Sequence, residues 1–209
     1  MCGLLRKNTW KGFVLLLFLP LFGFGCGDLP GDESGSIFMI EQIDPTYFDD
    51  STRQVDVFRD PLCSDDPENP DPEPYTDHFA DVTFTNRPLS NSVEQTASTI
   101  DLREYDVWYE PVTQGSLPLS SFNVTTVMDG NGIQPCDPGG DCPGETVSQI
   151  EFVPVRLKEE LAQFILSTGI FQLHYNIYYR FYGVNDFGYR VSAEGSTDFL
   201  VADYDNCGN

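Results

Sequence analysis

The chain has few basic residues: 11 Lys and Arg stand against 33 Asp and Glu in 209 residues, giving a formal charge of −22 at pH 7. Nucleic acids and anionic membrane surfaces are recognised through clusters of basic side chains, so this composition argues against both as direct partners. The chain is nonetheless 40% hydrophobic and 13% aromatic, which is too apolar for a disordered acidic tail. We therefore expect one domain with its own hydrophobic core.

Catalytic and metal-binding motifs are also missing. The sequence contains no G-x-S-x-G, H-E-x-x-H or Walker motif, and a Ser-His-Asp triad could use only His78 or His174. Neither a C-x-x-C pair nor a C-x-x-C-H motif occurs, which argues against structural zinc and c-type haem. We therefore expect a protein without catalytic activity. A hydrolase with paired carboxylates among the 33 acids is the least favoured alternative.

No apolar run is long enough to span a membrane. The run from Phe13 to Phe22 (FVLLLFLPLF) covers ten residues, whereas a spanning helix needs about 20. Basic residues between Arg6 and Lys11 precede it, and the small residues Gly23 and Gly25 follow it. A basic stretch, a short apolar run and small residues before a cleavage position are typical of an export signal. We expect residues 1–25 to be removed as a signal peptide.

The segment Gly23-Phe-Gly-Cys26 resembles the lipobox of bacterial lipoproteins. The resemblance implies cleavage before Cys26, diacylglycerol on the Cys26 thiol, and a lipid tether to the membrane. Gly27, rather than Asp, follows Cys26, which favours the outer membrane. Residues 26–36 are then a flexible stalk that is rich in Gly, Pro, Asp and Ser. The alternatives are an ordinary secretory signal that is cut nearby and an uncleaved anchor.

The remaining cysteines agree with export. Cys2 leaves with the signal, so the exported chain keeps four cysteines besides Cys26, an even number that indicates two disulfides in an oxidising compartment. The segment Cys136-Asp-Pro-Gly-Gly-Asp-Cys142 has a composition that turns sharply enough to join its two cysteines. Pairing them leaves Cys63 to pair with Cys207, which would tie the end of the chain to the start of the domain.

Acidic clusters raise the question of calcium. Without residues 1–25 the chain keeps 8 basic and 33 acidic residues, a charge of −25 that attracts cations and basic partners. Two segments, Asp129-Gly-Asn131-Gly and Asp203-Tyr-Asp205-Asn, open like calcium-binding loops, which use carboxylate and carbonyl oxygens. Ordinary turns are the alternative for both segments. The candidate calcium ligands are Asp129, Asn131, Asp203 and Asp205.

Alternating apolar and polar residues predict strands through residues 37–209. The clearest alternation runs from Phe171 to Phe181, where every second residue is apolar. A change of phase near Arg103 and Glu104 predicts a β-bulge, and the acidic, proline-rich stretch 63–74 predicts a loop. The other predicted strands are 37–43, 78–85, 100–109, 122–128, 147–153, 189–193 and 198–202.

One helix is predicted, from Val155 to Thr168, because its apolar residues recur at helical spacing and Gly169 follows at the expected stop. Short strands with a single crossover helix indicate an all-β, antiparallel sandwich. The segment from Leu173 to Asp203 resembles the last strands of an immunoglobulin or fibronectin type III domain, in which an aromatic-rich penultimate strand follows a helical corner. The resemblance implies an immunoglobulin-like β-sandwich.

A candidate binding face lies on the polar side of the predicted strand 171–181. Tyr178 and Tyr182 share that side with Arg180, and exposed Tyr with Arg is the composition of binding hot spots. The alternative is a strand that is buried on both sides. We therefore expect an interaction or structural module of the cell envelope, bound to the membrane by lipid and to an unknown envelope protein or surface ligand. The alternative is a calcium- or carbohydrate-binding surface domain.

Overall fold

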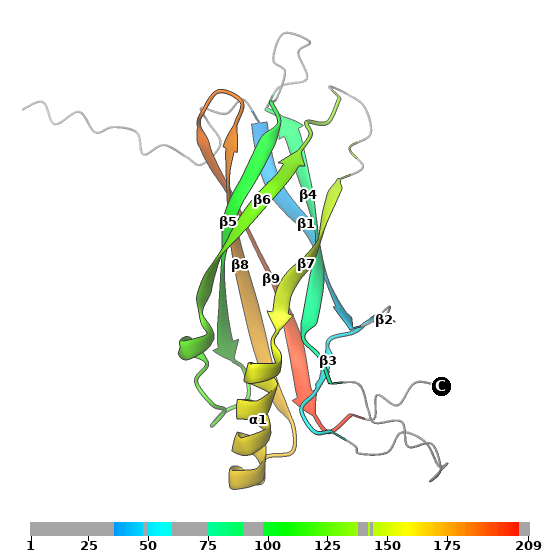
Figure 1. The fold of residues 1–209 in the computed structure, drawn as a ribbon, viewed down its shortest axis with the longest axis vertical. Coiled ribbons are helices and arrows are strands. Elements are labelled where there is room, and N and C mark those ends of the chain that lie inside the picture. Colours follow the sequence, from blue (N-terminus) through cyan, green and yellow to red (C-terminus); the bar gives the residue numbers. More distant parts are fainter. Residues whose placement is uncertain are drawn as a thin grey trace, which may run out of the picture.

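A computed structural model describes residues 36–47, 50–59, 75–89, 98–137, 142 and 144–204. They form two β-sheets packed face to face, with one α-helix at one end of the long axis (Figure 1). The predicted signal peptide, the predicted stalk up to residue 35 and the predicted loop 63–74 lie outside the described residues. In the part of the chain that is described, no helix has the length and apolarity needed to cross a bilayer.

The two sheets contain four and five strands. In spatial order, the first sheet is β2 (Asp50–Ser51), β1 (Ser36–Tyr47), β4 (His78–Pro88) and β7 (Glu145–Val153). The second is β3 (Gln54–Asp56), β9 (Arg190–Ala202), β8 (Leu173–Asn185), β5 (Ile100–Pro111) and β6 (Val124–Ile133). Neighbouring strands are antiparallel, except that β3 runs parallel to β9.

The order of the strands is immunoglobulin-like. The chain crosses between sheets after β2, β3, β4, β6 and β7, whereas β1–β2, β5–β6 and β8–β9 are hairpins within one sheet. We name β1, β4 and β7 as A, B and E, and β5, β6, β8 and β9 as C, C′, F and G. One sheet is then ABE with the short strand β2 beside A, and the other is C′CFG with the short strand β3 beside G. Such Greek-key connections are those of immunoglobulin-like sandwiches. The predicted antiparallel sandwich with one crossover helix is confirmed.

The helix α1 (Val155–Thr168) has the predicted bounds and connects β7 to β8. Leu157, Leu161 and Ile165 are buried against the core, as their spacing requires. Gly169 ends the helix with φ of 72° and donates its N–H to the carbonyl oxygen of Ile165. At the other end, the Val155 N–H donates to the Asp77 carboxylate at 2.6 Å, so a side chain from outside the helix caps its first turn.

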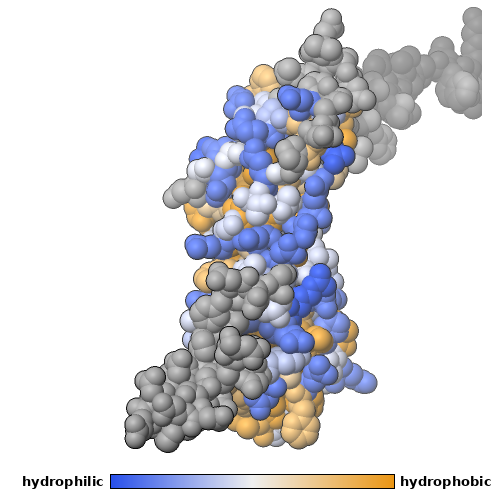
Figure 2. Space-filling model, turned by 90° about the vertical axis from the view of Figure 1, so that its right-hand side faces the viewer, coloured by the Kyte–Doolittle hydropathy of each residue, from blue (hydrophilic) through white to orange (hydrophobic). Residues whose placement is uncertain are grey.

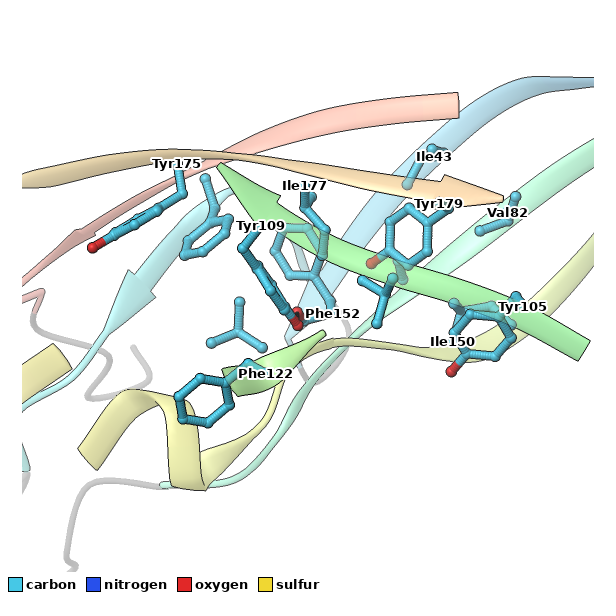
Figure 3. Packing of buried hydrophobic residues seen from close by; sticks show 14 of the residues in the cluster. Ile43, Val82, Tyr105, Tyr109, Phe122, Ile150, Phe152, Tyr175, Ile177 and Tyr179 are labelled. Atoms are coloured by element: carbon cyan, nitrogen blue, oxygen red, sulfur yellow. Dashed lines mark hydrogen bonds between the residues drawn. The ribbon is translucent and has the colours of Figure 1, made fainter. Parts of the chain in front are cut away.

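Tyrosine hydroxyls join the two sheets inside the core. Figure 3 shows Tyr105, Tyr109 and Tyr179 packed among the buried apolar residues. Tyr179 and Tyr109 donate to the carbonyl oxygens of Glu151 and Phe152 at 2.9 and 2.8 Å, and the Glu151 N–H donates to the Tyr105 hydroxyl at 3.2 Å. Burial raises the pKa of all three tyrosines, so they remain neutral. The three tyrosines therefore pair with backbone polar groups of β7 across the two sheets.

Two local predictions are wrong. Phe171 does not continue the buried side of β8; it is 83% exposed because the strand begins at Leu173 and Phe171 lies beyond it. The two strands predicted at 189–193 and 198–202 are one strand, β9. Gly195 lies in the middle of β9, where an added Cβ would come within 3.0 Å of the Ile40 side chain of β1. This glycine permits close packing between strands and does not form a turn.

The outermost strands β6 and β7 are both irregular. The register between β5 and β6 shifts between Leu102 and Glu104, which confirms the predicted bulge, and Gly130 in β6 has φ of 80°. In β7, Gln149 has φ of 62°, and the register with β4 shifts beside it. A residue other than glycine rarely adopts this conformation. Both strands are therefore bulged and not evenly extended.

Candidate binding face on the five-stranded sheet

The outward side of the five-stranded sheet carries a cluster that we call the Trp108 face. It consists of Asp106 and Trp108 from β5 and Tyr178, Arg180 and Tyr182 from β8. Trp108 lies opposite Tyr178, and Asp106 lies opposite Arg180. The residues between them along each strand point inward and are buried. The strand pairing thus places two aromatic rings and two opposite charges side by side.

Trp108 and Tyr178 form the centre of the face. Their rings are stacked, with centroids 5.4 Å apart and an interplanar angle of 12°. The Arg180 Cζ atom lies 5.8 Å from the centroid of the Trp108 ring, within the range of a cation–π contact. An offset aromatic pair is worth about 0.5–1.5 kcal/mol beyond the area that it buries. These contacts hold the indole in one orientation on a rigid sheet.

The Asp106 carboxylate is held from two sides. Its Oδ1 accepts from the Thr125 hydroxyl at 2.5 Å, and its Oδ2 accepts from the Tyr182 hydroxyl at 2.9 Å. Each carboxylate oxygen can accept a further hydrogen bond. Arg180 donates through Nε to Glu194 at 2.6 Å, and hydrogen bonding to Tyr182 and Glu194 raises its pKa. The face therefore presents an oriented anion beside a permanent cation.

A shallow hollow lies beside Trp108, and its volume is about 380 Å³. It combines an indole wall with a carboxylate, an amide, a hydroxyl and a guanidinium. A few convergent polar groups around an aromatic surface are the usual composition of a small-ligand site. The lining residues are Asp106, Val107, Trp108, Asn123, Val124, Thr125 and Arg180.

His174 lies on the same side of the sheet, nearer the start of β8. Its Nε2 is 3.0 Å from Asp198 Oδ2, and Arg53 donates to Asp198 Oδ1 at 2.7 Å. Ion pairs as exposed as these contribute about 0–1 kcal/mol. The other histidine, His78, is fully buried, and burial followed by the charge of Lys158 lowers its pKa to about 3. His78 is therefore a neutral core residue, and it is not exposed to a substrate.

A second exposed surface lies at the end of the molecule that contains α1. Figure 2 shows apolar surface at this lower end, and the exposed apolar side chains there include Leu166 of α1 and Phe171. Val112, which donates its N–H to the His174 carbonyl oxygen, is exposed on the adjoining loop. These three side chains are apolar, so they offer no hydrogen bonds that would orient a ligand.

The other predicted site residues are distributed as follows. The Cys136–Cys142 disulfide is present, with Cα atoms 5.0 Å apart, whereas Cys26, Cys63, Cys207 and Asp205 lie outside the described residues. Asn131 belongs to strand β6, and Asp203 is exposed just after β9. Asp129 is also in β6, but its side chain is outside the described set. Across the described residues, no three His, Cys, Asp or Glu side chains come together as a metal site.

The structure brings Tyr178, Arg180 and Tyr182 together on an exposed face, and it adds residues that the sequence analysis did not single out. Trp108 and Asp106 were missed because the cross-strand register, which pairs them with Tyr178 and Arg180, cannot be read from the sequence. A signal was nevertheless available: both occupy the polar positions between the buried residues of β5. A tryptophan at such a position indicates a binding surface.

Comparison of the chain with protein-family models, with characterised proteins and with solved structures found no match. Many unrelated functions share the immunoglobulin-like sandwich, so this fold does not by itself identify a function.

Proposed function

We propose that the chain is a lipid-anchored, non-catalytic binding module of the bacterial cell envelope that engages its ligand through the Trp108 face. The observation that carries this proposal is the stacked Trp108–Tyr178 pair, with Arg180 beside it, on the outward side of a sheet. Trp, Tyr and Arg are the residues most enriched among those that dominate binding energy.

The arrangement of the face favours binding. Its residues stand on the central strands β5 and β8, which pair over eleven positions from Ile100 to Pro111. Asp106 is fixed by two hydrogen bonds, so little side-chain freedom remains to be lost when a ligand arrives. A rigid, preorganised surface of this kind is suited to recognition. Chemistry would require, in addition, a titratable group with a perturbed pKa inside a pocket.

Export and anchoring are supported by separate features. The sequence before Cys26 resembles a lipoprotein signal, and the Cys136–Cys142 disulfide fits an oxidising compartment. Strand β1 begins at the end of the long axis opposite α1 (Figure 1). Ser36 is ten residues after Cys26, so the chain between them can span at most about 36 Å. In this proposal the stalk enters at that end, and the Trp108 face lies on the flank of the sandwich.

The proposal is tested with a diazirine amino acid at position 196, because Ser196 is exposed and pairs with Tyr178. A diazirine inserts into protein and sugar alike. Ser148 on β7, which is exposed in the other sheet, is the matched control position. Irradiation of intact envelopes should give a discrete crosslinked product from position 196 and none from position 148. The product from position 196 should be lost in the Trp108→Ala variant. Equal products from both positions, or none from position 196, would contradict the proposal.

A further inference from the structure

We infer that the ligand of the Trp108 face is a carbohydrate, bound as an uncharged pyranose ring in the hollow beside Trp108. This inference rests on the proposed function, because it names the ligand of the same face. A pyranose has apolar C–H faces and a rim of hydroxyl groups, so its site needs a flat apolar wall and hydrogen-bonding groups around it. The hollow supplies both the apolar wall and the hydrogen-bonding groups.

The wall is the Trp108 indole. Strand β5 lies between β8 and β6, so Trp108 has Tyr178 of β8 on one flank and the part of the hollow lined by β6 on the other. The Tyr178 ring stacks on the indole and fixes its plane. The flank toward β6 is left to border the hollow with Asn123 and Thr125. A sugar ring entering there would cover an aromatic surface whose orientation is already set.

The polar groups supply both acceptors and donors. Asp106 uses each of its oxygens once, toward Thr125 and Tyr182, and each oxygen can accept again from a ligand hydroxyl. The Asn123 Oδ1 accepts from the Tyr109 N–H at 3.4 Å, so the amide NH₂ is the part that can donate to a ligand. A sugar hydroxyl both donates and accepts. The hollow therefore offers a carboxylate that can accept a hydrogen bond from one hydroxyl of the sugar and an amide NH₂ that can donate to a neighbouring hydroxyl.

The volume of the hollow and the negative charge of the chain restrict the class of sugar further. A hollow of about 380 Å³ is near the lower end of small-ligand sites, and it is open to solvent. Such a site suits one ring of a longer glycan. The chain carries a net charge of −22, and Asp106 faces the hollow, so an acidic sugar would be repelled. The remaining class is uncharged sugars, including those with an N-acetyl group.

A basic peptide is the main competing ligand, because an acidic chain attracts cations. Against it, the Arg180 guanidinium already lies over the Trp108 ring and lines the hollow. A lysine or arginine of a partner would approach the same ring beside an existing cation, and the like charges would repel. An uncharged sugar avoids this repulsion and can accept hydrogen bonds from Arg180. The contacts around Trp108 therefore favour the sugar.

The tryptophan content of the chain allows a direct test. The sequence has two tryptophans, Trp10 and Trp108, so in the full chain with Trp10→Phe the fluorescence reports Trp108 alone. We would hold the protein in a detergent without a sugar headgroup. The probes are the neutral trisaccharides of chitin, starch and cellulose, the acidic trimer of galacturonic acid, and trilysine. A printed array of bacterial envelope glycans extends the neutral set.

A neutral glycan should change the Trp108 emission in a saturable way, while the acidic trimer and trilysine should not. Asp106→Asn, which keeps the side-chain shape, and Asn123→Ala should each weaken that binding about tenfold or more, as expected for the loss of a hydrogen bond in the site. Ser148→Ala is the control variant and should bind as the wild type does. Thermal melts of all variants show whether each is folded.

The inference is overturned if no neutral glycan on the panel or the array changes the emission, or if trilysine alone does. It is also overturned if folded Asp106→Asn and Asn123→Ala bind as tightly as Ser148→Ala. The two proposals fail separately. A crosslinked product from position 196 that depends on Trp108, together with no fluorescence response to sugars, would support the binding face and contradict only the carbohydrate as its ligand.

Discussion

The hydroxyl of Tyr179 in β8 donates a 2.9 Å hydrogen bond to the carbonyl oxygen of Glu151 in the facing sheet. Tyr179 is fully buried, so without the hydroxyl this carbonyl would lose a partner in the core. We expect Tyr179→Phe to lower the free energy of unfolding by about 1–3 kcal/mol. Tyr178→Phe, on the outward side of the same strand, should change it by less than about 0.5 kcal/mol. Urea denaturation of both variants measures the difference; equal losses would contradict the bond between sheets.

The outward position of Tyr178 and Tyr182 can be tested by removing both rings. The double variant Tyr178→Ser, Tyr182→Ser loses the stack on Trp108 and the hydrogen bond to Asp106. Since both side chains are partly exposed, we expect a loss of less than about 2 kcal/mol. Tyr179→Ser, one residue away in the core, should cost about 3–5 kcal/mol. A double variant as damaged as Tyr179→Ser would mean that the face is part of the core.

The buried His78 makes stability depend on pH. Its pKa is lowered from 6.5 to about 3, first by burial and then by Lys158, so between these values the unfolded chain binds a proton that the folded chain does not. The free energy of unfolding should therefore fall as the pH is lowered, by up to about 1.4 kcal/mol per unit. His78→Gln should lose this dependence. The measurement is the difference between wild type and variant from about pH 4 to about pH 7. Parallel curves would show that His78 does not titrate in this way.

The Cys136–Cys142 disulfide closes a short loop within the β6–β7 connection. The Cys136 N–H also donates a 2.9 Å hydrogen bond to the backbone carbonyl oxygen of the buried Asn86. In the chain-entropy account, a loop of this length contributes about 2 kcal/mol. We expect the variant Cys136→Ser, Cys142→Ser to lose about that amount in urea denaturation. Peptide mapping of the unreduced protein should give the 136–142 pair, and the sequence predicts a second pair of Cys63 with Cys207; any exchange between the two pairs would contradict the assignment.

Lipidation is tested at Cys26. Metabolic labelling with a fatty acid should mark the wild-type chain and leave Cys26→Ala unmarked, because the thiol carries the proposed diacylglycerol. Cys2→Ala is the matched control, since that cysteine lies within the proposed signal and should not affect labelling. Label that persists in Cys26→Ala, or is absent from wild type, would remove the anchor from the proposed function.

Periodicity alone predicted the helix and most strands because these elements obey simple spacing rules. The α1 residues Leu157, Leu161 and Ile165 repeat at helical spacing and end at Gly169, and the structure has the same bounds. The bulge near Arg103 was visible because a shift in register changes which side of the strand is apolar. Such features depend on neighbours in the chain, so the sequence contains them.

Features that depend on packing between distant segments were not predictable. Gly195 looked like a break between two strands because the sequence does not show Ile40 lying against it. Phe171 fitted the alternation of β8, but the strand begins only at Leu173. For the binding face, the sequence identified Tyr178, whereas its stack on Trp108 required the register between β5 and β8. A site on a sheet is assembled across strands, and one strand shows only its own part of it.

The bulges in β6 and β7 bear on how copies of the protein behave next to one another. Within the described chain these are outermost strands of the two sheets, and such edges can pair with a second copy and seed aggregation. Gly130 and Gln149, both at positive φ, interrupt the evenly spaced backbone groups that a regular intermolecular ladder requires. In the proposed lipid-anchored form, many copies on one membrane would meet at high local concentration. Their irregular edges, together with the acidic charge that each carries, would keep them from joining into fibres.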